Sequence, residues 1–170
     1  KALVHTVRAP LLEMGSAEPV VRQRRGSFSM RQRRVTRTRA KLWKQVASRD
    51  DFLDIEFEDL VRMTVREVSG ALHVSFSRYD SSFNRLWFRL PAVAGESIFG
   101  CGEQYSRLDL KGSFVPLWSE EQGIGRAHDL ITALANLRGG AGGSWHSTYF
   151  GQPSFVSSER SYVHVDTTAY

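Results

Sequence analysis

The stretch LVRMTVREVSGALHVSFS, residues 60–77, decides the fold class of this chain. On both sides of Ser69-Gly70, apolar residues alternate with polar ones, and a period of two is typical of a half-buried β-strand. A two-residue turn that contains glycine joins two such runs in a hairpin. The sequence therefore predicts antiparallel strands over 60–68 and 71–77, with one apolar face made of Val61, Met63, Val65, Leu72, Val74 and Phe76.

Further segments show the same alternation, while helical periodicity is scarce. The other segments that predict strands are 3–8, 25–31, 35–42, 85–90 and 162–166. Only 128–137 could form a short helix, and its apolar residues would suit a strand equally well. Many short strands without a long amphipathic helix predict an all-β chain folded as an antiparallel β-sandwich. Its 170 residues are enough for one domain, so we expect a single domain over 1–170.

Composition excludes several classes of protein. The chain has one cysteine, Cys101, so no disulfide can form within it. No apolar run approaches the roughly 20 residues that a membrane-spanning helix needs, so we expect no membrane partner. Residues 1–10 contain interrupting polar and charged residues and do not resemble a signal peptide. These features favour a cytoplasmic location.

Positive charge is concentrated in one segment. Ten arginines and lysines lie between Arg22 and Lys44 with no acidic residue among them, and the net charge of the whole chain is +5. One interpretation is a basic β-domain that binds polyanions or nucleic acid. Only Phe28 and Trp43 could stack on bases within the run, so we prefer a solvated sheet face and expect no nucleic-acid partner.

The block FGCGEQYS, residues 99–106, is the first candidate for a binding site. Glu103 and Gln104 could exchange hydrogen bonds with the neighbouring hydroxyls of a polyol. The competing interpretation is a tight turn at a strand end, in which glycine supplies unusual backbone angles. A dinucleotide-binding loop is excluded because Tyr105 stands where the third glycine of its fingerprint would be.

Two more polar blocks follow. Residues 108–126 repeat an acidic-amide-glycine element, and Arg126 could pair there with Glu121 or Asp109. In residues 145–158 the aromatic residues Trp145, Tyr149 and Phe155 could stack on a sugar ring, although aromatic residues of a β-domain usually belong to its core. Between these blocks, the glycine-rich segment 137–144 predicts a loop.

Other chemistries find little support. The best set of metal-ligand residue types is His146, His164 and Asp166, but their spacing matches no known ligand pattern, so we expect no metal site. Cys101 has no identifiable activating partner, so we do not expect it to act as a nucleophile. We expect no cofactor.

Three ordered motifs make the sequence recognisable. The segments GCGEQYSRLDLKG, PLWSEEQGIGR and GQPSFVSSERSYVHVD resemble the N-terminal domain of glycoside hydrolase family 31. Within that family the likeness is greatest to the sulfoquinovosidase branch, whose relatives include α-glucosidases. The resemblance extends from about Asn84 to Tyr170.

The resemblance implies a galactose-mutarotase-like β-sandwich that precedes a catalytic (β/α)8 barrel. Both catalytic carboxylates of a retaining α-glycosidase would then lie in the barrel, so this chain would be an incomplete, C-terminally truncated domain with no catalytic residue and no activity of its own. Its partners would be the barrel and an α-glycoside. Glu103, with Gln104 beside it, would lie on a loop that closes one side of the sugar pocket, and Glu103 is the expected sugar contact.

Overall fold

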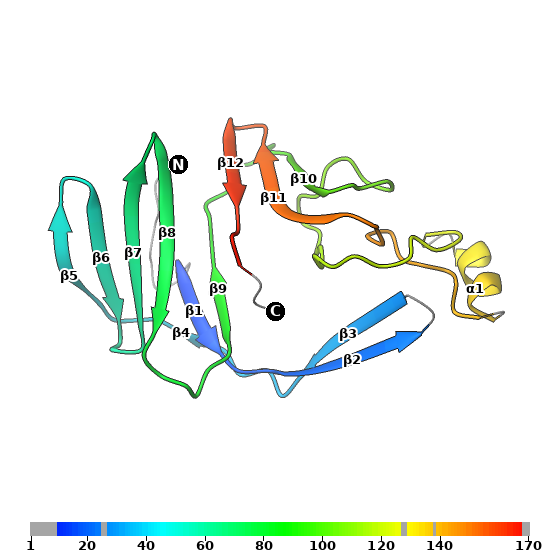
Figure 1. The fold of residues 1–170 in the computed structure, drawn as a ribbon, viewed down its shortest axis with the longest axis horizontal. Coiled ribbons are helices and arrows are strands. Elements are labelled where there is room, and N and C mark those ends of the chain that lie inside the picture. Colours follow the sequence, from blue (N-terminus) through cyan, green and yellow to red (C-terminus); the bar gives the residue numbers. More distant parts are fainter. Residues whose placement is uncertain (1–9, 25–26, 127–128, 138, 168–170) are drawn as a thin grey trace. The chain divides into compact units, whose positions relative to one another are not determined.

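The computed structural model describes residues 10–24, 27–126, 129–137 and 139–167. The chain forms two compact units. Unit 1 comprises Lys1–Pro19 and Gln32–Pro91, and unit 2 comprises Val20–Arg31 and Ala92–Tyr170. Figure 1 shows that strands dominate both units. The all-β expectation is confirmed, whereas the single-domain expectation stays a prediction.

Unit 1 contains two antiparallel sheets. The larger sheet is a meander of β5 (Trp43–Arg49), β6 (Phe52–Phe57), β7 (Val61–Val68) and β8 (Ala71–Arg78). The smaller sheet has the order β4 (Thr38–Arg39), β1 (Leu12–Gly15), β9 (Arg85–Phe88).

The hairpin predicted over 60–77 is the β7–β8 pair. Met63 lies opposite Phe76 and Val65 opposite Val74, which puts the predicted apolar residues of the two strands side by side. Both turn residues have positive φ, 52° at Ser69 and 80° at Gly70. Positive φ at both positions is the geometry whose twist matches that of the flanking strands, so the short turn fixes the register.

The core of unit 1 fills the space between its two sheets. Leu12, Met14, Phe57, Val61 and Met63 are each at most 2% exposed. Half-buried residues of β8 and β9 pack against this cluster, and the rings of Phe76 and Phe88 meet edge to face with their centroids 5.3 Å apart. The predicted antiparallel sandwich is therefore confirmed. The apolar face ends before Leu72, which is 63% exposed.

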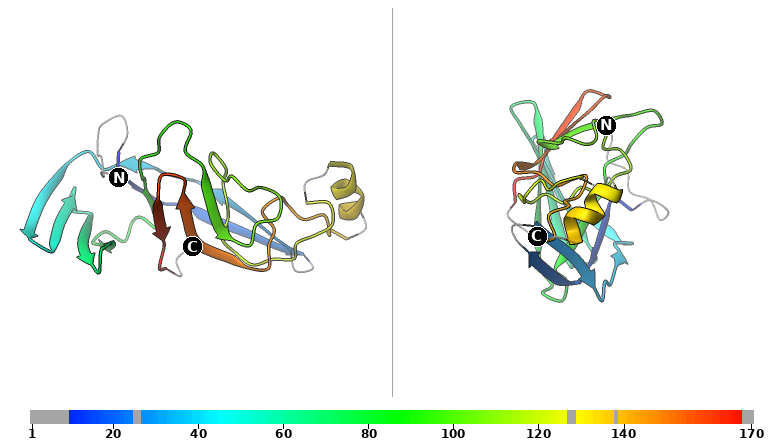
Figure 2. Two further views of the ribbon diagram at one scale, coloured as in Figure 1. Left: turned by 90° about the horizontal axis from the view of Figure 1, so that it is seen from above. Right: turned by 90° about the vertical axis from the view of Figure 1, so that its right-hand side faces the viewer.

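Unit 2 has a smaller sheet and long connecting segments. Its three strands are β10 (Ile98–Gly102), β11 (Gly151–Ser157) and β12 (Ser161–His164), paired in that order. Helix α1 (Asp129–Leu137) buries none of its residues, and Figure 2 shows it away from this sheet. Strands β2 (Glu18–Arg24) and β3 (Ser27–Arg33) pair with each other, and Val20–Arg31 belongs to unit 2.

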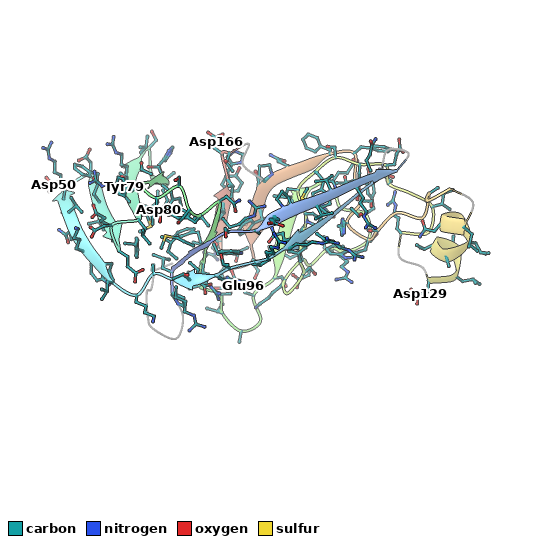
Figure 3. The ribbon with its side chains drawn as sticks, turned by 90° about the horizontal axis from the view of Figure 1, so that it is seen from below. Asp50, Tyr79, Asp80, Glu96, Asp129 and Asp166 are labelled. Carbon is teal, nitrogen blue, oxygen red and sulfur yellow. The ribbon has the colours of Figure 1, made fainter. Side chains whose placement is uncertain are left out.

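The buried residue Glu96, labelled in Figure 3, closes the start of the β10–β11 pair. Its side chain accepts a hydrogen bond from Ser157 Oγ and another, of 2.9 Å, from the Val93 backbone N–H. A buried carboxylate needs such donors because it has lost its hydration. Glu96 therefore connects the segment before β10 to the end of β11.

Several sequence expectations are confirmed and others need correction. The strands expected over 85–90 and 162–166 appear as β9 and β12, that over 25–31 as β3, and the short helix as α1. The strand expected over 3–8 lies outside the described residues. The strand expected over 35–42 is wrong except for Thr38–Arg39, because only these two residues pair with β1. Six further strands were not predicted from the sequence: β1, β2, β5, β6, β10 and β11.

In the part of the chain that the structure describes, no helix has the length and hydropathy that crossing a membrane requires.

One ion-pair cluster holds the smaller sheet of unit 1 together. Glu13 in β1 is only 3% exposed and accepts hydrogen bonds from Arg37 (2.6 and 2.9 Å) and from Arg89 (2.5 and 3.2 Å). Arg39 Nε lies 3.6 Å from its other oxygen. Burial opposes ionisation of Glu13, but the hydrogen bonds and charges of Arg89 and Arg37 outweigh it, so the pKa of Glu13 is below its ordinary value.

We predict that Glu13→Gln destabilises the chain by about 1–3 kcal/mol, because it removes the charge that two partly exposed arginines share. The lowered pKa means that this stabilisation is complete above the ordinary value of 4.5 and is lost as pH falls toward the folded-state pKa. The difference in unfolding free energy between wild type and variant should therefore shrink below that pH.

The matched control is Glu18→Gln, because Glu18 and its partner Arg34 are exposed, at 56% and 81% of their side chains. Exposed pairs contribute little, so this variant should differ from wild type by less than about 1 kcal/mol. Urea titrations at pH 7 and pH 3.5 measure both effects. Equal losses in the two variants would contradict a special role for Glu13.

Candidate functional site

A bulge at the end of β10 creates the loop that carries the first motif block. Gly100, Cys101 and Gly102 all have positive φ, at 118°, 60° and 88°, and the pairing with β11 shifts register between the two glycines. A Cβ at position 102 would lie 2.1 Å from the Phe150 carbonyl oxygen. The unusual backbone angles predicted for the glycines are confirmed. They form a bulge within β10 and do not end it, because the strand stays paired with β11 as far as Gly102.

The bulge presents Glu103 to solvent. The Glu103 backbone N–H donates to the Phe150 carbonyl at 2.9 Å, which anchors the loop next to the start of β11. The Glu103 side chain is exposed. Gln104 is half-buried and its Nε2 donates to the Cys101 carbonyl at 3.2 Å. The Glu103 carboxylate is therefore exposed to solvent, whereas the Gln104 side chain stabilises the loop through its hydrogen bond to the Cys101 carbonyl.

Next to Glu103, a hollow of about 530 Å³ brings the three motif blocks together. Tyr105, which lines it, has a raised pKa, chiefly because of a hydrogen bond to Glu103. The hollow is lined by Tyr105 and Ser106 of the first block and by Arg107 directly after it, by Gly123, Gly125 and Arg126 of the second block, and by Trp145 of the third. Blocks that are up to forty residues apart thus form one surface.

Each arginine of the hollow is stacked on an aromatic ring. The guanidinium carbon of Arg126 lies 4.3 Å from the centre of the Tyr105 ring, and Nη2 donates to Gln122 Oε1. That of Arg107 lies 4.3 Å from the centre of the Trp145 ring, and Nη1 donates to Ser113 Oγ at 3.1 Å. Such stacking holds a guanidinium by cation–π attraction.

The carboxylates expected beside Arg126 have other partners. Glu121 accepts a 2.8 Å hydrogen bond from the Tyr149 hydroxyl, which raises the pKa of Tyr149. Asp109 accepts 3.0 Å hydrogen bonds from the backbone N–H groups of Ile98 and Lys111, and these lower its pKa. The sequence suggested ion pairs, but Asp109 acts as a local backbone cap.

A buried hydrogen bond that sequence reasoning missed joins the second and third blocks. Glu120 is 6% exposed and accepts a 2.7 Å hydrogen bond from Ser147 Oγ. The Glu120 N–H also donates to the Thr148 carbonyl at 2.8 Å. His146 Nδ1 is 3.8 Å from Glu120; burial lowers the pKa of His146, and the Glu120 charge opposes that shift. The buried Glu120–Ser147 hydrogen bond holds the segment that contains Trp145 against the second block.

The three aromatic residues of the third block do not belong to a closed core. Tyr149 is 57% exposed, while Trp145 and Phe155 are half-buried. Trp145 packs beneath Arg107, and Phe155 lies in β11 opposite Gly100 and Val163. Of the three, only Trp145 lines the hollow that holds the arginines.

The remaining candidates are the metal-ligand residue types and Cys101. No cluster of three metal-ligating residues exists among the described residues, and His164 Nδ1 is 2.7 Å from Ser154 Oγ. Cys101 is half-buried, and burial raises the pKa of its thiol, which disfavours the thiolate.

Much of the basic segment is paired with acidic residues that lie elsewhere in the sequence. Glu13 contacts Arg37 and Arg39, Glu18 contacts Arg34, and Lys44 lies within 2.8 Å of both Glu56 and Asp59. In the folded chain, acidic residues from other segments therefore neutralise part of the positive charge of this segment. Weak, salt-sensitive attraction to polyanions stays a prediction.

Comparison with known proteins bears on the resemblance. No family model matches the sequence. The chain is 34% identical to a sulfoquinovosidase of Escherichia coli (strain K12) over 99% of its own length, and 39% identical to one of Agrobacterium fabrum over 57% of its length. A solved structure, a GH31 family sulfoquinovosidase from E. rectale in complex with the aza-sugar inhibitor IFGSQ, superposes with a TM-score of 0.88 at 32% identity over 96% of this chain.

This likeness over almost the whole chain supports a sulfoquinovosidase-like N-terminal domain similar to those of glycoside hydrolase family 31. The chain spans about a quarter of its relatives: the match covers 26% of the E. coli protein and 25% of the E. rectale chain. The sulfoquinovosidase-like region is thus one part of the larger enzymes it matches. The match to the E. coli relative also extends through the segment before Asn84.

The geometry of the β10 bulge leads to a prediction about Gly102. Gly102→Ala should destabilise the chain by about 1–3 kcal/mol more than Gly95→Ala, because its Cβ would strike backbone atoms. Gly95 is the matched control, since its φ of 79° is close to the 88° of Gly102 and a Cβ there meets nothing within 4 Å. Thermal melts of both variants measure the difference. Equal losses of stability in the two variants would mean that the positive φ explains both, and that a steric clash at position 102 adds nothing.

Proposed function

We propose that this sulfoquinovosidase-like domain is the non-catalytic part of a retaining α-glycosidase and forms one edge of the pocket that binds the sugar. The observation that carries the proposal is the meeting of the three motif blocks at one hollow, beside the exposed Glu103. All lining residues except Trp145 belong to two of the segments on which the resemblance to glycoside hydrolase family 31 rests, GCGEQYSRLDLKG and PLWSEEQGIGR. An α-sulfoquinovoside is the leading substrate, because the relatives are named sulfoquinovosidases.

The lining of the hollows supports a non-catalytic role. Retaining glycosidases use two carboxyl groups roughly 5–5.5 Å apart across the scissile bond. Neither the hollow at Arg126 nor a second one of about 380 Å³ beside β11 has an Asp or Glu in its lining of described residues. A (β/α)8 barrel would supply the nucleophile and the acid/base residue.

Glu103 is suited to hold sugar hydroxyls. A carboxylate accepts several hydrogen bonds, and two neighbouring hydroxyls of one ring can donate to it together. Its backbone is anchored to Phe150, so the side chain starts from a fixed position. Gln104 contributes indirectly, because its amide holds the Cys101 carbonyl.

The test is a steady-state assay with chromogenic α-sulfoquinovoside and α-glucoside on three proteins: the chain, the chain joined to a catalytic barrel, and the joined protein with Glu103→Ala. The chain alone should show no turnover. Glu103→Ala should lower kcat/KM of the joined protein by about ten- to a hundredfold, the effect of losing a charged hydrogen-bond partner.

The control is Glu159→Ala, which removes an exposed carboxylate from the turn between β11 and β12 and should leave kcat/KM unchanged. Turnover by the purified chain would refute the non-catalytic role. An unchanged kcat/KM in a folded Glu103→Ala protein would reduce Glu103 to a polar loop residue.

A further inference from the structure

Strand β8 forms one edge of the larger sheet of unit 1. The strand order is β5-β6-β7-β8, so β8 pairs with β7 on one side and with no described strand on the other (Figure 1). The strand is eight residues long, and from Ala71 to Ser77 the sequence contains no Lys, Arg, Asp, Glu or Pro. Such an edge presents a row of unpaired backbone groups with which another chain can pair.

The other described edge strands have features that prevent edge-to-edge pairing. β5, at the far edge of the same sheet, contains Lys44 and Arg49, and its register shifts between Gln45 and Ala47. β10 carries the bulge described above, both β2 and β3 contain arginine, and β4, β9 and β12 have at most four residues. Charges, bulges and short length each protect an edge. Over 71–77, β8 has none of these features.

The pairing with β7 determines which backbone groups of β8 point to the open edge. Tyr79, directly after the strand, donates its N–H to the Leu60 carbonyl at 2.8 Å, and the register is unbroken along the whole of β8. In an antiparallel sheet, residues that bond to one neighbouring strand alternate with residues that bond to the other side. The odd-numbered residues of β8 therefore bond to β7, and Leu72, Val74 and Phe76 direct their N–H and C=O groups to the open edge.

The same three residues carry the apolar side chains of β8. Val74 and Phe76 are half-buried and pack against the core of unit 1, whereas Leu72 is 63% exposed. A partner strand beside β8 that covered Leu72 with an apolar side chain would remove this surface from water. The edge therefore fits an extended strand with apolar residues at alternate positions.

The edge is complementary to a second copy of itself. When two β8 strands lie antiparallel about a two-fold axis at Val74, the two Val74 residues are opposite each other, and Leu72 is opposite Phe76 of the second copy. Each opposed pair then exchanges two backbone hydrogen bonds, because all three residues direct their backbone groups to the edge. Cross-strand contact between an aliphatic and an aromatic side chain adds stability, and no like charges are opposed over 71–77.

We propose that the open edge of β8 is an interface through which two copies of this chain pair, with Val74 on the two-fold axis and the two larger sheets joined into one. The pair uses both β8 edges and leaves the protected β5 edges outside, so assembly stops at the dimer. A single strand edge buries less surface than a standard interface, so the dissociation constant should lie in the micromolar range. The inference is independent of the proposed function, because it rests on unit 1 alone.

Sedimentation velocity of the 170-residue chain between about 5 and 500 µM measures the association. The wild type should change from monomer to dimer as its concentration rises. Leu72→Lys places a charge on the open edge and should weaken the dimer at least about tenfold. Because Leu72 is exposed in the single chain, this substitution leaves the core intact. Val46→Lys is the matched control: it places the same charge on the β5 edge, where Val46 is 44% exposed, and should dimerise like wild type.

Cysteine cross-linking tests the register. In a Cys101→Ser background, Val74→Cys should form a disulfide between two copies, because opposed residues of a hydrogen-bonded pair have Cα atoms about 5.5 Å apart, within disulfide range. Ser77→Cys is the control, since in this register it and its counterpart lie on opposite sides of the axis, about 20 Å apart. Electrophoresis without reducing agent separates the cross-linked dimer from the single chain.

Three results would overturn the proposal. One is a chain that stays monomeric over the whole concentration range. Another is a dimer that Leu72→Lys, shown to be folded by circular dichroism, leaves unchanged. The third is cross-linking that is as efficient through position 77 as through position 74, because it would show association without the two-fold register.

Discussion

The buried carboxylate of Glu13 is the constraint on which the smaller sheet of unit 1 depends. Strand β1 lies between two short strands, and each neighbouring segment sends an arginine back to Glu13: Arg37 before β4, and Arg89 after β9. Only two residue pairs join β1 to β4, so backbone bonding alone ties that edge weakly. A charge buried without partners would be costly, and this makes both arginines necessary once Glu13 is enclosed. The side of β1 that carries Leu12 and Met14 is then available to face β6 and β7 across the core.

Unit 2 depends on a different constraint, the close approach of backbones. Gly102 lies so near the Phe150 carbonyl that no side chain fits, and the same approach anchors the Glu103 N–H. The bulge therefore ends the pairing and sets the direction of the loop in one step. The buried Glu120–Ser147 hydrogen bond likewise fixes the position of the segment that contains Trp145. A precise hollow is thus built on segments with little regular secondary structure.

Side chains of opposite charge lie on neighbouring parts of this surface. Glu103 is exposed, whereas Arg107 and Arg126 line the hollow and are stacked on aromatic rings. Tyr105 lies between them, bonded to Glu103 at its hydroxyl and covered by Arg126 on its ring.

Local features of the fold follow from neighbouring residues in the sequence. Alternation over 60–77 specifies two strands, and Ser69-Gly70 specifies their turn, because side-chain period and turn geometry depend only on neighbours. The strand β6 also alternates, with Leu53, Ile55 and Phe57 on one face, so that signal was present and overlooked. The motif blocks pointed to segments that line the hollow in the folded chain. The meeting of Arg37 and Arg89 at Glu13, and the stacking of Arg126 on Tyr105 in place of an ion pair with Glu121, depend on the folded chain. These contacts join side chains from separate segments, and which of several chemically equivalent partners a charge takes depends on distances that folding sets, not on spacing along the chain.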